Sequence, residues 1–240
     1  MEFRDQFLTL SAGDVNASGG VQSTLAILGK DVRSELRTRY AVNALLMFVV
    51  VTLSVILFAL AGETVDRSVH AGLLWVVMFF AAMSGLSRSF VSEEERGTTM
   101  TLQLIASPAA VYAGKLLFNM VLTMLLNVFI VLLFLLFIPE FSPLQQDLFW
   151  MVILLGGIAV SSATTIIAAI IARANTKGTL FPVLSFPILL PLLMAGISAT
   201  KISMDDKTWV NVWPDLQILG SYIVVVITAS VLLFEYVWKD

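Results

Sequence analysis

Residues 85–115 read GLSRSFVSEEERGTTMTLQLIASPAAVYAGK, and they form the only long polar and charged interruption in an otherwise apolar chain. Apolar runs long enough to cross a bilayer lie on both sides of this segment. A segment this rich in charged and helix-capping residues, placed between two spans, faces water or a water-soluble partner. The sequence therefore predicts a membrane protein whose function centres on one polar connection.

The acidic half of this connection predicts a short helix that ends at an elbow. Ser92 followed three residues later by Glu95 forms a capping box, and the neighbouring carboxylates lie at the positive end of the helix dipole. Gly97, followed by two threonines, weakens the helix. We therefore expect the chain to bend at Gly97.

A second helix is predicted for residues 100–106, with Leu102 and Ile105 on one face. Ser107 followed by Pro108 is the signature of a capped helix with proline at its first position, so a third helix begins there. The connection is thus expected to fold as helix, elbow, helix at the membrane surface.

This connection also carries a resemblance to a known class of proteins. The run EEERGTTMTLQLIASP, followed by Gly114 and Lys115, resembles the pattern between the second and third membrane helices of ABC-2 transporter permeases. Within that class the chain resembles the CcmB family over about residues 25–238, through three further stretches: SELR (34–37), GLLWVVMFFAAMSGLSR (72–88) and FPVLSFPILLPLL (181–193).

The resemblance implies a permease subunit of an ATP-driven complex in the bacterial inner membrane. It implies a partner ATPase subunit (CcmA), membrane neighbours CcmC and CcmD, the haem chaperone CcmE, and pairing of two permease copies. ATP hydrolysis in that family serves haem export or release of the haem-loaded chaperone. Haem is then a substrate, ATP acts through the partner, and no cofactor is expected on this chain.

Residues of the polar connection are expected to couple the permease to its ATPase. The carboxylates, Arg96 and an exposed Leu102 would engage a cleft in the ATPase, with Gly97 as elbow and Lys115 holding the interface. The predicted coupling residues are Glu93, Glu94, Glu95, Arg96, Gly97, Thr98 and Leu102, and the predicted interface helix carries Pro108, Gly114 and Lys115.

Composition agrees with an all-α polytopic membrane protein that has six transmembrane helices, an N-terminal interfacial helix and a cytoplasmic coupling segment between helices 2 and 3. Of 240 residues, 58% are hydrophobic and 13% charged, which is too apolar for a soluble domain. A net charge of -3 does not favour nucleic acid as a partner, and the absence of cysteine excludes disulfides and thiolate ligands.

Three regions are predicted along the chain. Residues 1–22 read as a flexible tail, residues 23–40 as an amphipathic helix on the lipid surface, and residues 41–238 as the transmembrane domain. The six predicted spans cover residues 41–61, 72–90, 109–138, 148–171, 180–197 and 216–238.

Basic residues predict the orientation. With a cytoplasmic N-terminus, eleven of the 14 Lys and Arg residues lie inside, and only Arg67, Lys201 and Lys207 lie outside. Both termini and the polar connection are therefore expected in the cytoplasm.

Several residues within the spans stand out. Gly157, Ser161, Thr165 and Ala169 recur every four residues and predict close helix packing. Asn119 and Asn127 either hydrogen-bond to neighbouring helices or line a transport path. The prolines of the fifth span predict a bend or a broken helix, which is either static or a gate; they are Pro182, Pro187 and Pro191.

No catalytic constellation can be assembled from the sequence, so the chain is not expected to be an enzyme. Gly29-Lys30 and Gly114-Lys115 lack the remaining residues of a nucleotide-binding loop. His70, the single histidine, is expected in a loop between spans one and two, either solvated or, by the resemblance, as an axial haem ligand. Two alternatives stay open: an ABC-2 permease for a lipid-linked glycan or drug, and an assembly scaffold that transports nothing.

Overall fold

The computed structural model describes residues 11–61, 63, 65–86, 90, 93, 97–173, 180–205 and 209–239. The elements in these ranges are all helices: α2 (Ser11–Thr38), α3 (Tyr40–Ala59), α4 (Arg67–Leu86), α6 (Thr99–Ile105), α7 (Pro108–Phe137), α8 (Gln146–Arg173), α9 (Leu180–Met204) and α10 (Trp209–Lys239). Six of them are long and apolar enough to cross a membrane, namely α3, α4, α7, α8, α9 and α10. The predicted all-helical architecture with six candidate spans is confirmed.

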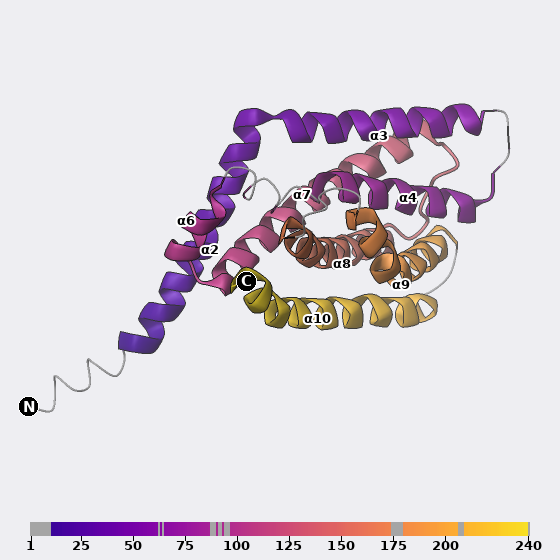
Figure 1. Ribbon diagram of the computed structural model, residues 1–240. Coiled ribbons are helices and arrows are strands. Elements are labelled where there is room, and N and C mark those ends of the chain that lie inside the picture. The colour runs from indigo at the N-terminus through magenta and orange to yellow at the C-terminus, as the bar shows by residue number, and fades with distance from the viewer. Residues whose placement is uncertain are drawn as a thin grey trace, which may run out of the picture.

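The six long helices form a bundle in which α8 is the most buried and α3 and α10 are the least buried. Helix α8 packs against α4, α7, α9 and α10. Helix α2 crosses one end of the bundle at a steep angle, with α6 beside it and the C-terminal end of α10 close by (Figure 1). The polar connection therefore lies at the end of the bundle that also holds α2 and the C-terminus.

A tryptophan fills the centre of the bundle because two neighbouring helices carry glycine opposite it. A Cβ atom added to Gly156 of α8 would lie 2.1 Å from the ring of Trp75, and one added to Gly196 of α9 would lie 2.4 Å from it. The indole of Trp75 also donates a hydrogen bond of 2.8 Å to the Thr200 hydroxyl. This side chain of α4 thus joins α8 and α9 by shape and by one buried polar contact.

Helix α4 begins earlier than the predicted second span, and this changes the place of the histidine. The Asp66 carboxylate accepts a 2.7 Å hydrogen bond from the Ser68 amide, and the Asp66 carbonyl accepts from the Val69 amide at 2.9 Å. Hydrogen bonds from Ser68 also lower the pKa of Asp66 below its ordinary value. The cap starts α4 at Arg67, so His70 lies within a helix and is buried. The prediction of a loop histidine was wrong.

The connection between α9 and α10 is also shorter than the interval between the predicted spans 180–197 and 216–238. Helix α9 continues to Met204 and α10 begins at Trp209. Two polar residues in the last turns of α9 have partners inside the protein: Thr200 accepts from the indole described above, and the Ser203 hydroxyl donates to the Thr200 carbonyl at 2.6 Å. Polar side chains with internal partners do not end a buried helix.

The N-terminal region differs from the prediction as well. Helix α2 begins at Ser11, so residues 11–22 are helical where a flexible tail was expected, and residues 1–10 lie outside the described ranges. Helix α2 packs on α7 through residues such as Thr24, Ile27 and Asp31, and a helix that is already nucleated extends at little cost. Arg39 has φ 52° between α2 and α3, and the chain turns there (Figure 1).

Candidate functional site

The elbow and the second helix of the polar connection form as predicted. Gly97 has φ +67°, a left-handed conformation that glycine adopts without steric cost. Helix α6 follows over Thr99–Ile105. The Ser107 side chain then accepts a 3.4 Å hydrogen bond from the Ala110 amide, with Pro108 in the first turn of α7. These local features were readable because capping and glycine signals act within a few residues.

Four charged side chains from three parts of the chain meet above the start of α7. The ammonium of Lys115 lies 3.0 Å from the Asp31 carboxylate of α2 and 2.9 Å from the Glu93 carboxylate of the connection. Lys30 pairs with the same Glu93 oxygen and lies 3.4 Å from Asp31. Lys115, Asp31 and Glu93 are buried, whereas the Lys30 side chain is 43% exposed. We call these four residues the charge cluster; its formal charge is balanced.

The surroundings of Glu93 hold it in its ionised form. Burial raises its pKa, but the Lys115 ammonium and hydrogen bonds from Lys30 and Thr98 outweigh burial and lower the pKa to about 2. Glu93 also accepts a backbone hydrogen bond from the Thr98 amide at 3.0 Å. The acidic residue next to the elbow therefore ties the connection to both α2 and α7.

An aromatic group closes the cluster on the side of α10. The Phe90 ring lies 5.8 Å from the Lys115 ammonium, within reach of a cation–π interaction. Phe90 also packs on Phe234, which stacks on Trp238 at 5.4 Å between ring centroids. Gln103 of α6 donates a 2.6 Å hydrogen bond to the Trp238 carbonyl. The connection is therefore fixed to the last turns of α10 as well.

A glycine next to Lys115 allows α2 to reach the cluster. A Cβ atom added to Gly114 would lie 2.8 Å and 2.9 Å from side-chain atoms of Ile27, and 3.0 Å from the Thr24 carbonyl oxygen. The Ile27 contact includes its Cβ atom, which cannot move without the backbone. In the Gly114-Lys115 pair, glycine thus permits the close approach of α2 and lysine supplies the ion pair with it.

The comparison with protein families agrees with this arrangement. The family model described as CcmB protein matches residues 22–235, which is most of the chain. The chain belongs to the CcmB family. Members are the membrane subunit of the ABC transporter that acts as the haem exporter of cytochrome c maturation. In this family the permease itself does not hydrolyse ATP, and a search of curated proteins gives no match to the chain.

Membership in the CcmB family has two further implications, one for the partner protein and one for the membrane. It implies partnership with the ABC ATPase subunit CcmA in the cytochrome c maturation system. It also implies the inner membrane, in agreement with the six candidate spans.

Against this background, two predicted coupling residues lie inside the CcmB-family fold. Leu102 was expected to be exposed but is 6% exposed, and Glu93 is 8% exposed. Leu104 is instead 86% exposed, because residues two apart on a short helix point to different sides. Neither Leu102 nor Glu93 can insert into a partner in this conformation. The remaining predicted charges, Glu94, Glu95 and Arg96, lie outside the described residues.

Lys115 also differs from the prediction, because it holds together parts of its own chain. Its side chain is 3% exposed, and both of its carboxylate partners belong to the same CcmB-family chain. Asp31 was not among the predicted site residues, and its burial was missed. The available signal was its position four residues after Ile27, which puts both residues on one helix face.

His70 does not lie in an open loop of this CcmB-family protein. It is 2% exposed, and its Nδ1 atom has no hydrogen-bond partner among the described residues. Within those residues, no group of three His, Asp or Glu side chains is arranged to hold a metal ion. Haem ligation by His70 remains an untested prediction.

The prolines do not break α9, which runs as one helix from Leu180 to Met204. Pro182 lies in the first turn, where its missing amide would have had no helical partner. Pro187 and Pro191 lie inside the helix. Tyr222 of α10 donates a 2.9 Å hydrogen bond to the Ile188 carbonyl next to them. Of the two predicted forms, a bend or a broken helix, the continuous α9 excludes the break, and a gating role for these residues stays a prediction.

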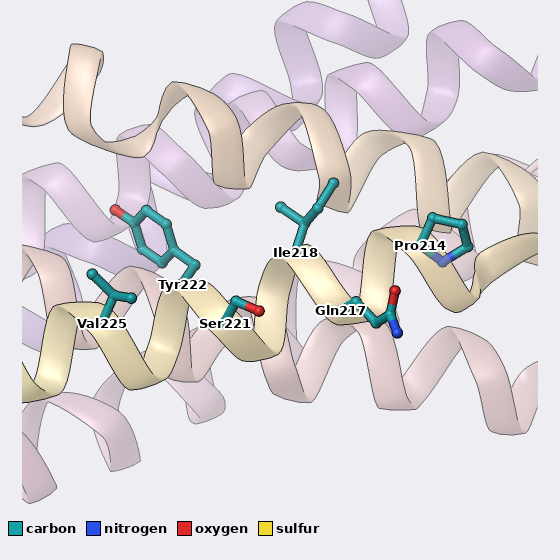
Figure 2. Close-up of a pocket in the computed structure, with 6 residues that line it drawn as sticks. All are labelled: Pro214, Gln217, Ile218, Ser221, Tyr222 and Val225. Carbon is teal, nitrogen blue, oxygen red and sulfur yellow. The ribbon is translucent and has the colours of Figure 1, made fainter.

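A shallow groove of about 560 Å³ follows the outer face of α10, away from the charge cluster. Figure 2 shows its lining residues along one side of this helix: Pro214, Gln217, Ile218, Ser221, Tyr222 and Val225. Gln217 and Ser221 are exposed on a helix that is long and apolar enough to span the membrane. Sequence analysis did not single out this face.

Proposed function

We propose that the segment between α4 and α7 couples ATP hydrolysis in the CcmA-like subunit to movement of the membrane domain. The observation that carries the proposal is the charge cluster. Its central residue, Lys115, lies in the first turns of a candidate span and binds carboxylates from both α2 and the connection. A displacement of the connection would therefore move α2 and α7 with it, because breaking the ion pair of Lys115 with Asp31 or with Glu93 leaves buried charge uncompensated.

The surface that meets the ATPase in this proposal is the exposed side of α6. Leu104 is the large apolar side chain there, at 86% exposure, and it replaces Leu102 in the predicted role. Glu94, Glu95 and Arg96 precede α6 in the sequence, and in this proposal they supply the charged part of the contact, as the resemblance led us to expect. An exposed apolar anchor that follows a charged segment in the sequence suits a cleft in a soluble partner.

The wider assembly follows from the same proposal. The connection and both termini lie in the cytoplasm, two copies act together, and CcmC-like, CcmD-like and CcmE-like proteins are the further partners. The exposed faces of α3 and α10 offer room for membrane helices of such partners. ATP hydrolysis then drives either the export of haem or the release of the haem-loaded chaperone.

A pull-down in detergent tests the coupling surface. We expect Leu104→Asp to lose most of the co-purified ATPase subunit, and Glu95→Lys to lose it as well, while both variants insert into the membrane. Val210→Asp is the matched control, since Val210 is 79% exposed at the opposite end of the bundle. Equal ATPase recovery with Leu104→Asp and Val210→Asp would show that α6 is not the docking surface.

Covalent haem staining of c-type cytochromes tests the role in the cell. Deleting the chain should abolish staining, and the wild-type chain should restore it, whereas Leu104→Asp should not. An ATPase-dead partner should give the same loss. Normal staining with the dead ATPase would instead favour a scaffold that is indifferent to hydrolysis.

A further inference from the structure

A buried polar column leads from the charge cluster into the membrane domain. It lies on one face of α7 at a spacing of four residues, and all of its members are buried: Lys115, Asn119, Thr123 and Asn127. A run of small residues at the same spacing faces it from α8: Ala169, Thr165, Ser161 and Gly157.

Two contacts establish how the helices are aligned. The Asn119 amide donates a 2.8 Å hydrogen bond to the Thr165 hydroxyl. Two turns further along α7, the Asn127 amide nitrogen lies 2.9 Å from the position that a Cβ atom on Gly157 would take. Residue numbers therefore rise along α7 as they fall along α8, by the same number of residues. This antiparallel alignment places Thr123 opposite Ser161.

Hydrogen bonding is incomplete at the middle of the column. The side-chain oxygen atoms of Asn119 and Thr123 are buried and have no hydrogen-bond partner among the described residues. On the α8 side, the Ser161 hydroxyl donates to the Ile158 carbonyl at 3.0 Å, and the Thr165 hydroxyl donates to the Ser161 carbonyl at 2.6 Å. The α8 donors are thus occupied, but the Ser161 oxygen can still accept.

The unpartnered atoms have the chemistry of a water site. Asn119 Oδ1 is an acceptor, and the Thr123 hydroxyl is both donor and acceptor. They lie one helical turn apart on the same face, opposite the small side chain of Ser161. A buried water typically makes two to four hydrogen bonds to atoms of this kind.

We infer that an ordered water molecule bridges Asn119 and Thr123 between α7 and α8. It donates to Asn119 Oδ1 and accepts from, or donates to, the Thr123 hydroxyl. The column that begins at Lys115 is then a hydrated seam inside the membrane domain, distinct from the coupling surface on α6.

One shape-preserving substitution, Thr123→Val, distinguishes a hydrated seam from a dry one, whereas Asn119→Leu also removes the hydrogen bond to Thr165 and lowers stability in either case. Removing a polar atom that is buried without a partner relieves a desolvation penalty and raises stability, whereas removing one that holds a water lowers it. We expect Thr123→Val and Asn119→Leu each to lower the midpoint of thermal unfolding in detergent, Thr123→Val by about 2–4 °C. An unchanged or higher midpoint for Thr123→Val would overturn the inference.

The matched control is Thr164→Val, on the neighbouring helix. Thr164 is equally buried, but its hydroxyl already donates to the Val160 carbonyl at 2.7 Å and lies 3.2 Å from the Ser161 carbonyl. Its loss should change the midpoint less than the loss of the Thr123 hydroxyl.

A second measurement detects the water directly. Radiolytic hydroxyl labelling of the folded, wild-type protein modifies buried side chains that lie beside bound water. We expect labelling at the buried positions Asn119 and Thr123 of the wild type and its loss at Asn119 in Thr123→Val, with size exclusion used to select folded protein. Absence of labelling in the folded wild type would overturn the inference even if the variants are unstable.

Discussion

Replacing Lys115 by methionine removes the central charge of the cluster while keeping a long, flexible side chain. The lysine side chain is 3% exposed, and the side chains of its partners Asp31 and Glu93 are 9% and 10% exposed. Removing one partner of a buried pair costs about 3–5 kcal/mol, because the remaining charge is left uncompensated. Lys30 stays beside both carboxylates, so we expect the lower end of this range, about 3 kcal/mol.

Thermal unfolding in detergent, followed by size-exclusion chromatography of the heated samples, measures this loss. For a chain of this size, about 3 kcal/mol corresponds to a midpoint about 6–12 °C lower. Lys30→Met is the matched control, because Lys30 binds the same carboxylates but is 43% exposed. Its loss should cost at most about 1 kcal/mol.

A rescue experiment separates charge from packing in the Lys115→Met variant. Adding Glu93→Gln removes a carboxylate that has lost its buried partner and keeps only the half-exposed Lys30, so the double variant should recover part of the lost stability. Equal midpoints for Lys115→Met and Lys30→Met, or strict additivity of Lys115→Met and Glu93→Gln, would refute the view that the cluster stabilises the connection.

Three other predictions follow from the same geometry. The folded-state pKa of Glu93 lies near 2, below the ordinary 4.5, so the stabilisation that ionised Glu93 gives the fold is complete above about pH 4.5 and is lost as the pH falls toward 2. In pH-dependent unfolding, the difference in stability between wild type and Glu93→Gln should therefore shrink over that range. A difference that stays constant would contradict the ion pairs of Glu93. Gly114→Ala should destabilise the protein by about 1–3 kcal/mol, because the new Cβ meets the Ile27 Cβ atom and the Thr24 carbonyl oxygen of α2. Gly29→Ala, on an open helix face, should stabilise it by up to about 1 kcal/mol in the same thermal unfolding experiments. Similar effects of the two substitutions would exclude close packing of α2 against α7. Gly196→Ala should displace the Trp75 ring and shift its fluorescence spectrum. An unchanged spectrum and an unchanged midpoint of thermal unfolding would argue against close packing of Trp75 on Gly196.

Much of the fold could be predicted because its signals are local or compositional. Span number follows from long apolar runs, since a bilayer admits few other structures. The elbow at Gly97 and the cap at Ser107 follow from chemistry within one helical turn, and both are observed. The same holds for the family, whose resemblance rests on short continuous stretches of sequence.

Other features were missed because they depend on distant parts of the chain. Leu102 and Leu104 are alike in sequence, and only the packing of α6 makes the first buried and the second exposed. His70 looked like a loop residue until the cap at Asp66 was seen to begin α4 before it. Which face of a helix is buried depends on the elements that pack against it, and residues nearby in the sequence do not reveal those elements.

The sequence by itself determined that this chain is a helical membrane protein with six candidate spans and one polar connection of the CcmB type, because hydropathy and capping act over short distances. Tertiary structure alone decided that Lys115 joins Asp31 of α2 to Glu93 of the connection, residues far apart in the chain. The physical reason is that buried charges must be paired wherever the fold brings them together, and the partner is selected by three-dimensional proximity rather than by spacing along the sequence.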